Sequence, residues 1–139
     1  MAEALKEITW ELTTALYNAL KDQITYPVYK VIPKPPESAY VYIGNVTYNT
    51  EGTKEDWLYE GTVTIRVVDE SHSAGDLKEA LEVVSQIRQI LKPNKTTVLT
   101  LSTSNNIIFS PASTSATITL SEEGLARNEI YDIYRFVIE

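Results

Sequence analysis

Apolar residues recur at three- and four-residue steps in two parts of the chain, which is the spacing of one face of a helix. The first part is 3–22, where the apolar positions are Leu5, Ile8, Leu12, Ala15, Leu16, Ala19 and Leu20. The second is 76–91, where they are Leu77, Ala80, Leu81, Val84, Ile87 and Leu91. A proline follows each segment, at Pro27 and Pro93, and ends the helical pattern. The spacing predicts two amphipathic helices whose apolar stripes pack into a core.

Elsewhere apolar and polar residues alternate, which is the period of a half-buried strand. The clearest case is 57–69, and a second strand is expected at 39–46, with the polar loop 45–56 between them. These two strands predict a long hairpin with a protruding tip. A short edge strand at 28–32 leads into the proline-rich connector 33–36, and a final strand covers 128–139.

Residues 96–121 are rich in Ser and Thr and contain short apolar runs at 98–101, 106–109 and 117–120. These runs predict short strands joined by loops. The order of elements is helix, two or three strands, helix, then more strands. It predicts an α+β fold, with an antiparallel or mixed β-sheet and two α-helices packed on one face, in a single domain over 1–139.

The predicted strands have two apolar faces. In the last strand, Tyr134 and Phe136 share one face and Tyr131 lies on the other, and Tyr40 and Tyr42 oppose apolar neighbours in the same way. Strands of this kind need cover on both faces, and two helices supply only half of it. Either the Ser/Thr-rich strands fold over the second face as a sandwich, or a neighbouring subunit covers it.

Nine tyrosines slightly favour a neighbouring subunit, because tyrosine suits contacts that are apolar at one end and wet at the other. The candidate subunit-interface residues are Tyr40, Tyr42, Tyr131, Tyr134 and Phe136.

Composition removes several classes of function. The absence of cysteine excludes disulfides, thiolate metal sites and cysteine nucleophiles. A formal net charge of -7 disfavours sequence-specific binding to nucleic acid. No apolar run is long enough to cross a bilayer, and the charged N-terminus lacks the features of a signal peptide, so we expect folding in a cytoplasm and no membrane contact.

Candidate catalytic chemistry is sparse. His72, the single histidine, lies in a Ser/Gly turn near Asp69, Glu70 and Asp76, but the spacing is not that of a metal site. A solvated turn residue is the favoured interpretation. No glycine-rich phosphate loop is present, and the carboxylate clusters fall in polar segments. The sequence predicts a protein without enzymatic activity, catalytic residues, metal or cofactor.

Short motifs follow one another along nearly the whole chain. They are Ala15-Leu16-Tyr17-Asn18-Ala19-Leu20, Val31-Ile32-Pro33, Pro36 before Tyr40-Val41-Tyr42-Ile43-Gly44, Asp56-Trp57, the strand 61–68, the helix 77–91, and Arg135-Phe136 in the last strand. In this order they resemble the tail-terminator and tail-completion proteins of long-tailed bacteriophages. The Ser/Thr-rich stretch 94–121 departs most from the family pattern.

The resemblance implies a virion protein of the tail or neck, assembled in the host cytoplasm. Such proteins form a ring, typically a hexamer, that caps the tail tube and ends its polymerisation. The implied partners are the tail-tube protein on one side and a head-completion or connector protein on the other. The candidates for a loop that lines the lumen or contacts the tube are Glu51, Glu55, Asp56 and Trp57. An acidic lumen would let DNA pass without specific binding.

Two alternatives remain open on the sequence. One is a different head–tail connector, neck or baseplate subunit. The other is a cytoplasmic module that binds a small ligand or peptide through the Tyr40 and Tyr42 face or the segment 33–36. This second alternative predicts a stable monomer with a concave pocket.

Overall fold

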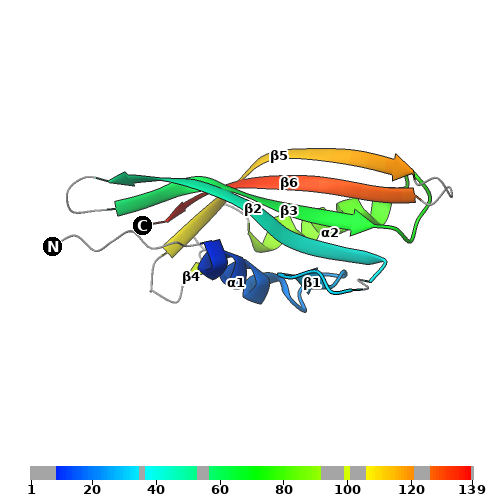
Figure 1. The fold of residues 1–139 in the computed structure, drawn as a ribbon, viewed down its shortest axis with the longest axis horizontal. Helices are drawn as coiled ribbons and strands as arrows, with labels where there is room; N and C mark the ends of the chain where they lie inside the picture. The colour runs from blue at the N-terminus through cyan, green and yellow to red at the C-terminus, as the bar shows by residue number, and fades with distance from the viewer. Residues whose placement is uncertain are drawn as a thin grey trace.

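The structure is a computed structural model that describes residues 9–34, 37–52, 57–91, 99–100, 106–120 and 126–138. Within these ranges the chain forms one mixed sheet of order β1-β2-β3-β6-β5-β4 with two helices (Figure 1). The helices are α1 (Thr9–Leu20) and α2 (Lys78–Ile90). The strands are β1 (Val28–Tyr29), β2 (Ala39–Gly52), β3 (Trp57–Asp69), β4 (Leu99–Thr100), β5 (Asn106–Leu120) and β6 (Ala126–Ile138). Only β1 pairs with its neighbour in parallel among these strands, and the expected α+β fold is confirmed.

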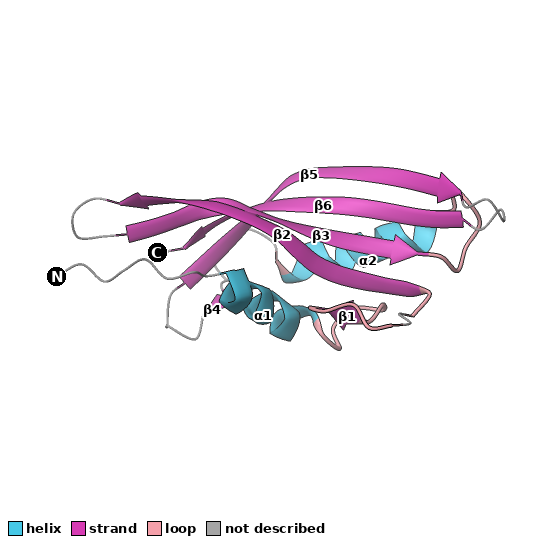
Figure 2. Ribbon diagram, viewed as in Figure 1, coloured by secondary structure: helices cyan, strands magenta, loops and turns pink. Residues whose placement is uncertain are grey.

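Both helices pack on the same face of the sheet, which we call the covered face (Figure 2). α1 lies against β1 and β2, and α2 lies against β3 and β6. The predicted stripe of α2 is confirmed at its fully buried members Ala80 and Ile87, but Leu81 is 46% exposed and Val83 is fully buried. The buried positions follow the steps of three and four residues that define one helix face, and residue 81 lies outside them.

The covered face carries the hydrophobic core. Val63, Ile65 and Val67 of β3 are fully buried and alternate with residues that point to the other side. Cross-strand partners continue the same rows, with Ile130 of β6 opposite Val67 and Tyr134 opposite Val63. Leu12, Leu16 and Leu20 of α1 close the core from below and are also fully buried. Full burial of a side chain of this size stabilises the fold by about 1.5–3 kcal/mol.

The β2–β3 hairpin is longer than the sequence predicts. β2 continues to Gly52 and pairs with β3 as far as Gly52 opposite Trp57, so the expected loop 45–56 is wrong over residues 45–52. A β-bulge between Gly44 and Thr47 interrupts the ladder, and Asn45 there has φ 52°. Asparagine tolerates this left-handed conformation better than most residues. The bulge hid the strand because it breaks the alternation of residue types.

The Ser/Thr-rich region also differs from expectation. Residues 106–120 form one continuous strand, β5, where the sequence predicts short strands and loops. β5 pairs with β6 in the same sheet, with a register shift at Pro111/Ser113. The described parts of this region, 99–100 and 106–120, therefore widen the sheet and do not fold over its second face, so the sandwich alternative is wrong for these residues. No helix in the described part of the chain is long and apolar enough to span a membrane.

Candidate assembly interface

The face of the sheet opposite the helices, which we call the open face, carries aromatic and charged residues in cross-strand rows. Tyr42 of β2, Arg66 of β3 and Tyr131 of β6 form one row. The guanidinium of Arg66 lies 5.6 Å from the centre of the Tyr42 ring, within the range of a cation–π contact. All three side chains are half-buried, so this row presents stacked, partly wet aromatic surface.

Glu129 of β6 is the centre of an ionic network on this face. Its Oε2 lies 3.4 Å from Arg66 Nε and 3.7 Å from Arg127 Nη2. The Tyr131 hydroxyl donates to the same oxygen at 3.5 Å. Arg127 Nη2 in turn donates to the Tyr40 hydroxyl at 3.4 Å. Because Glu129 is only 9% exposed, these two arginines neutralise a carboxylate that has lost most of its water.

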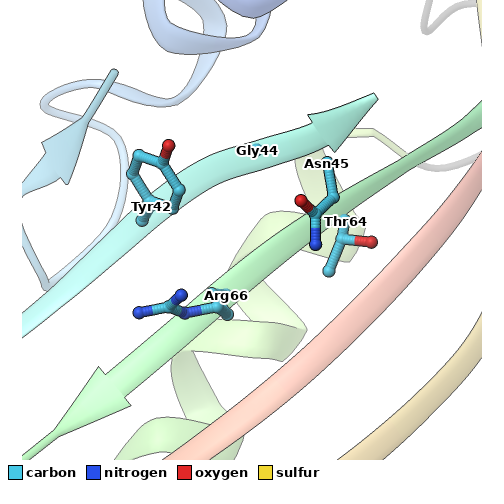
Figure 3. A pocket seen from close by; sticks show the side chains of 5 residues that line it. All are labelled: Tyr42, Gly44, Asn45, Thr64 and Arg66. Atoms are coloured by element: carbon cyan, nitrogen blue, oxygen red, sulfur yellow. The ribbon is translucent and has the colours of Figure 1, made fainter. Parts of the chain in front are cut away.

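A shallow hollow of about 30 Å³ lies on the open face beside the bulge of β2 (Figure 3). Tyr42, Gly44, Asn45, Thr64 and Arg66 line it. A Cβ atom at Gly44 would approach the Tyr42 ring to 2.6 Å, so glycine leaves room for that ring. The hollow holds about one water molecule, whereas small-ligand sites measure about 300–1,000 Å³. It gives no support to the small-ligand alternative.

The structure divides the five predicted interface residues between the two faces. Tyr40, Tyr42 and Tyr131 lie on the open face, although Tyr40 is only 3% exposed and packs against the Tyr29 ring at 5.4 Å. Tyr134 and Phe136 lie on the covered face and are fully buried, so the prediction of an interface is wrong for these two. Both faces of the last strand are apolar in sequence, and the pattern does not say which one the helices cover.

Three charged residues of the open face were missed in the sequence, namely Arg66, Arg127 and Glu129. The alternation of the strands could have found them. Arg127 and Glu129 lie an even number of positions from Tyr131 and so share its face, and Arg66 is the cross-strand partner of Tyr131. The predicted loop residues are placed only in part. Glu51 and Trp57 belong to the paired end of the β2–β3 hairpin, and Glu55 and Asp56 lie outside the described residues.

A second polar cluster joins the end of β3 to α2. Asp69 is fully buried, and its Oδ1 accepts bonds from the Ser71 backbone N–H at 2.8 Å and the Ser71 hydroxyl at 2.6 Å. His72 Nδ1 lies 2.6 Å from Asp69 Oδ2, which also accepts a bond from the Tyr26 hydroxyl at 3.1 Å. His72 lies in the expected turn and its side chain is 33% exposed, but it pairs with Asp69, which the sequence does not predict.

The charges in this cluster shift one another's protonation. The hydrogen bond and the charge of Asp69 raise the pKa of His72 above its ordinary 6.5. Burial alone would raise the pKa of Asp69, but the hydrogen bonds from Ser71, His72 and Tyr26 outweigh it and hold that pKa below its usual value. Burial and the two nearby carboxylates raise the pKa of Tyr26, which therefore stays neutral and donates.

Asp69, His72 and Glu79 also place three potential metal-ligand atoms within 4.8 Å of one another. Two of the three residues already accept hydrogen bonds within the protein, because the Tyr26 hydroxyl bridges Asp69 and Glu79 at 3.1 Å each. Asn128, the cross-strand partner of Asp69, accepts from the Gly75 backbone N–H and donates to the Ser73 carbonyl, both at 3.0 Å. These hydrogen bonds explain the cluster as a structural tether, by which we mean the contacts of Asp69, His72, Glu79 and Asn128 that hold the β3–α2 connection in place.

No protein-family model matches this sequence, and no curated protein matches it. Among solved structures, the fold is similar to a chain from the virion of a native gene transfer agent particle, with a TM-score of 0.69 and 17% sequence identity. The alignment covers 94% of this chain and 96% of that chain. At this identity the likeness shows a shared fold, and the coverage shows that it extends over nearly all of both chains.

Proposed function

We propose that this chain is a non-enzymatic structural subunit of a phage virion, and that it closes into a ring at the end of the tail tube. The observation that carries the proposal is the fold shared with a virion chain over 94% of this chain and 96% of that one. The order of tail-terminator motifs in the sequence independently points to the same class. The ring ends polymerisation of the tube and forms part of the joint between head and tail.

The open face supports this role because it offers surface suited to protein contacts. Tyrosine and arginine are the residue types that most often dominate the energy of protein interfaces, and Tyr42, Arg66 and Tyr131 lie together there. Their half-buried state leaves apolar area that a partner can cover. In this proposal the open face contacts another virion subunit, either in the ring or across the joint.

The β2–β3 hairpin is the proposed contact with the tube or the lumen. Figure 1 shows it extending past the helices at the end of the molecule that carries Glu51 and Trp57. The partners proposed are the tail-tube protein on one side of the ring and a head-completion or connector protein on the other. A formal net charge of -7 favours passage of DNA without retention.

The test is the mass of the protein in solution, by light scattering after size exclusion, with and without purified tail-tube protein. We expect a ring, typically of six copies, or a monomer that assembles only on tube ends. A monomer that never binds the tube would contradict the proposal. A labelled subunit located by negative-stain imaging at the neck plate or baseplate, away from the tube end, would favour the alternative of another connector subunit.

A further inference from the structure

Two β-bulges lie on opposite sides of the central pair of strands, β3 and β6. In β2, two residues separate Gly44 from Thr47, while one residue separates their partners in β3, so β2 carries one extra residue there. In β5, one residue separates Pro111 from Ser113, while their partners in β6 are adjacent, so β5 carries one extra residue as well. The two strands that flank the central pair are therefore lengthened by the same amount.

The registers place the two bulges level with each other. Val63 of β3 lies opposite the β2 bulge, because it is the residue between the partners of Gly44 and Thr47. Val63 pairs with Tyr134 of β6, and Tyr134 pairs with Pro111 at the start of the β5 bulge. β3 and β6 pair with each other without a register shift. The extra residues thus mark one line across the sheet, which we call the bulge line.

A twist gathered at the bulge line explains why both flanking strands need an extra residue there. In a twisted sheet the outer strands follow longer paths than the central strands. One residue adds about 3.3 Å of strand, and a bulge also increases the local right-handed twist. Figure 1 shows the result: among β2, β3, β5 and β6, β5 is uppermost and β2 lowest at the right, whereas this order is reversed at the left.

The contact at Gly61 shows how closely β2 approaches β3 beside the bulge line. A Cβ atom at Gly61 would lie 2.0 Å from the Thr47 carbonyl oxygen and 2.6 Å from Tyr48 Cα, so only glycine allows the two backbones to come this close. Asn45 within the bulge has φ 52°, a left-handed conformation that β-branched residues avoid. The residue types at both positions therefore suit a strong local twist.

The bulge line divides the sheet into two halves with different surfaces. The proximal half comprises 39–44, 64–69, 113–120 and 126–133. The distal half comprises 47–52, 57–62, 106–111 and 134–138. The open-face row of Tyr42, Arg66 and Tyr131 lies in the proximal half, and the end of the β2–β3 hairpin with Trp57 lies in the distal half. The twist between the halves therefore sets the angle between these two surfaces.

We propose that the two bulges act as a matched pair that fixes the angle between the proximal and distal halves, and that this angle decides whether the contacts between copies close into a ring. Repeated contacts between two different surfaces close into a ring only at a suitable angle, and otherwise give an open filament. The matched action of the bulges rests on the strand registers alone. Its effect on closure rests on the proposed function.

Deletion of one extra residue on each side tests the matched pair. Deletion of Asn45 places Val46 opposite Val63 and keeps the other β2–β3 pairs, and deletion of Ala112 likewise gives β5 a regular ladder with β6. Each single deletion should lower the urea midpoint, because one flanking strand becomes too short for the twist that the other imposes. The double deletion should lower it by less than the sum of the two losses, because the flanking strands match again.

Additive losses in the double deletion would overturn the proposal, and so would a double deletion that does not fold. β3 and β6 separate β2 from β5, so the two deletions lie three strand spacings apart, or about 14 Å. Changes at this distance that share no partner normally add. A double deletion that is more stable than the sum predicts therefore shows coupling through the twist of the whole sheet.

The angle itself is measured with pairs of spin labels, because the natural chain contains no cysteine. Glu60→Cys labels the distal half and Thr117→Cys the proximal half, and both positions are exposed. We expect the distance between these labels to change in the double deletion and in Gly61→Ala, whose Cβ pushes β2 away from β3. The control pair, Thr117→Cys with Ser85→Cys on α2, does not cross the bulge line and should keep its distance. An unchanged distance across the bulge line would overturn the proposal.

The link to ring closure is measured by light scattering of the double deletion, with and without tail-tube protein. We expect filaments or monomers under conditions where the wild type forms rings. Rings of wild-type mass, from a double deletion whose label distance has changed, would overturn this link. A wild type that never binds the tube, together with coupled deletions, would reject the tail-end role and support the matched pair.

Discussion

The covered and open faces of the sheet are built from the same three central strands, yet they are stabilised in different ways. In β6, Ile130, Tyr134 and Phe136 point to the helices and are fully buried, while Tyr131 and Ile133 point the other way and are half-buried. The covered face is held by close packing, and the open face by a charge network around Glu129. The difference separates residues that are fully buried in the core from residues that stay partly exposed on the other face.

The largest effect expected is on the covered face. Phe136 is fully buried and its ring lies 6.3 Å from that of Phe109. Phe136→Ala leaves a cavity at this contact and should lower the free energy of unfolding by about 3–5 kcal/mol. Urea unfolding followed by circular dichroism measures the change. The matched control is Val137→Ala at the next position, which is half-buried, and it should lower the free energy of unfolding by less than about 1.5 kcal/mol. Equal losses of stability in the two variants would contradict the distinction between the faces.

A charge buried on the covered face is expected to matter next. Asp132 is fully buried, and it accepts from Thr114 Oγ1 at 2.9 Å and from Arg88 Nη2 at 3.3 Å. Arg88→Met removes the cation and leaves the carboxylate with one neutral donor. Because the Arg88 side chain is 43% exposed, solvent screens part of the pair, and we expect a loss of about 2 kcal/mol.

The same pair gives a sharper test as a double-variant cycle. Arg88→Met combined with Asp132→Leu removes both charges, and replacement of a buried pair by apolar residues is often close to neutral. We expect the double variant to be more stable in urea than Arg88→Met alone. A double variant that is less stable than Arg88→Met would mean that Asp132 stabilises the covered face even without its cation, through the bond from Thr114.

The open face should show the reverse pattern, with a small loss of stability and a large loss of assembly. Tyr131→Ala removes a half-buried ring that neither α1 nor α2 covers, so we expect the free energy of unfolding in urea to fall by less than about 1 kcal/mol. If the open face is an interface, the same change should weaken association by about 2 kcal/mol, or roughly 30-fold. Light scattering over a concentration series measures this, with Ser115→Ala, its cross-strand neighbour, as control. Unchanged assembly would remove the open face from the interface.

The elements that the sequence predicts well are those with one buried face. β3 spans Trp57–Asp69, the range that alternation predicts, because its inward residues Val63, Ile65 and Val67 are apolar and most outward residues are polar. α2 likewise follows its apolar stripe. β5 shows no such signal, since residues 111–120 are exposed on both faces and burial selects no period there. A strand that is exposed on both faces is therefore hard to find by alternation.

The candidate interface was predictable only as a set of aromatic residues. The sequence indicates that one face of β6 remains for a partner, but Tyr131 and Tyr134 are equivalent in the pattern. Their assignment depends on the side from which α1 and α2 pack, which is a property of the chain connections. The pairing of Asp69 with His72 was also out of reach, because it depends on the burial of the end of β3 beside Tyr26.

The smallest effect expected concerns the tether that attaches α2 to the covered face. The pKa of His72 is raised in the folded protein, so its charged form contributes stability below about 6.5, and this contribution is lost as the pH rises through the raised value. The pKa of Asp69 is lowered, so its contribution is present above about 3.8 and is lost as the pH falls through the lowered value. The cluster is therefore strongest between these two pH values. Urea midpoints of the wild type should therefore fall as the pH rises from about 6.5 through the raised pKa of His72. His72→Gln, which removes the single histidine, should flatten this slope, and an unchanged slope would show that the pair does not stabilise the attachment of α2.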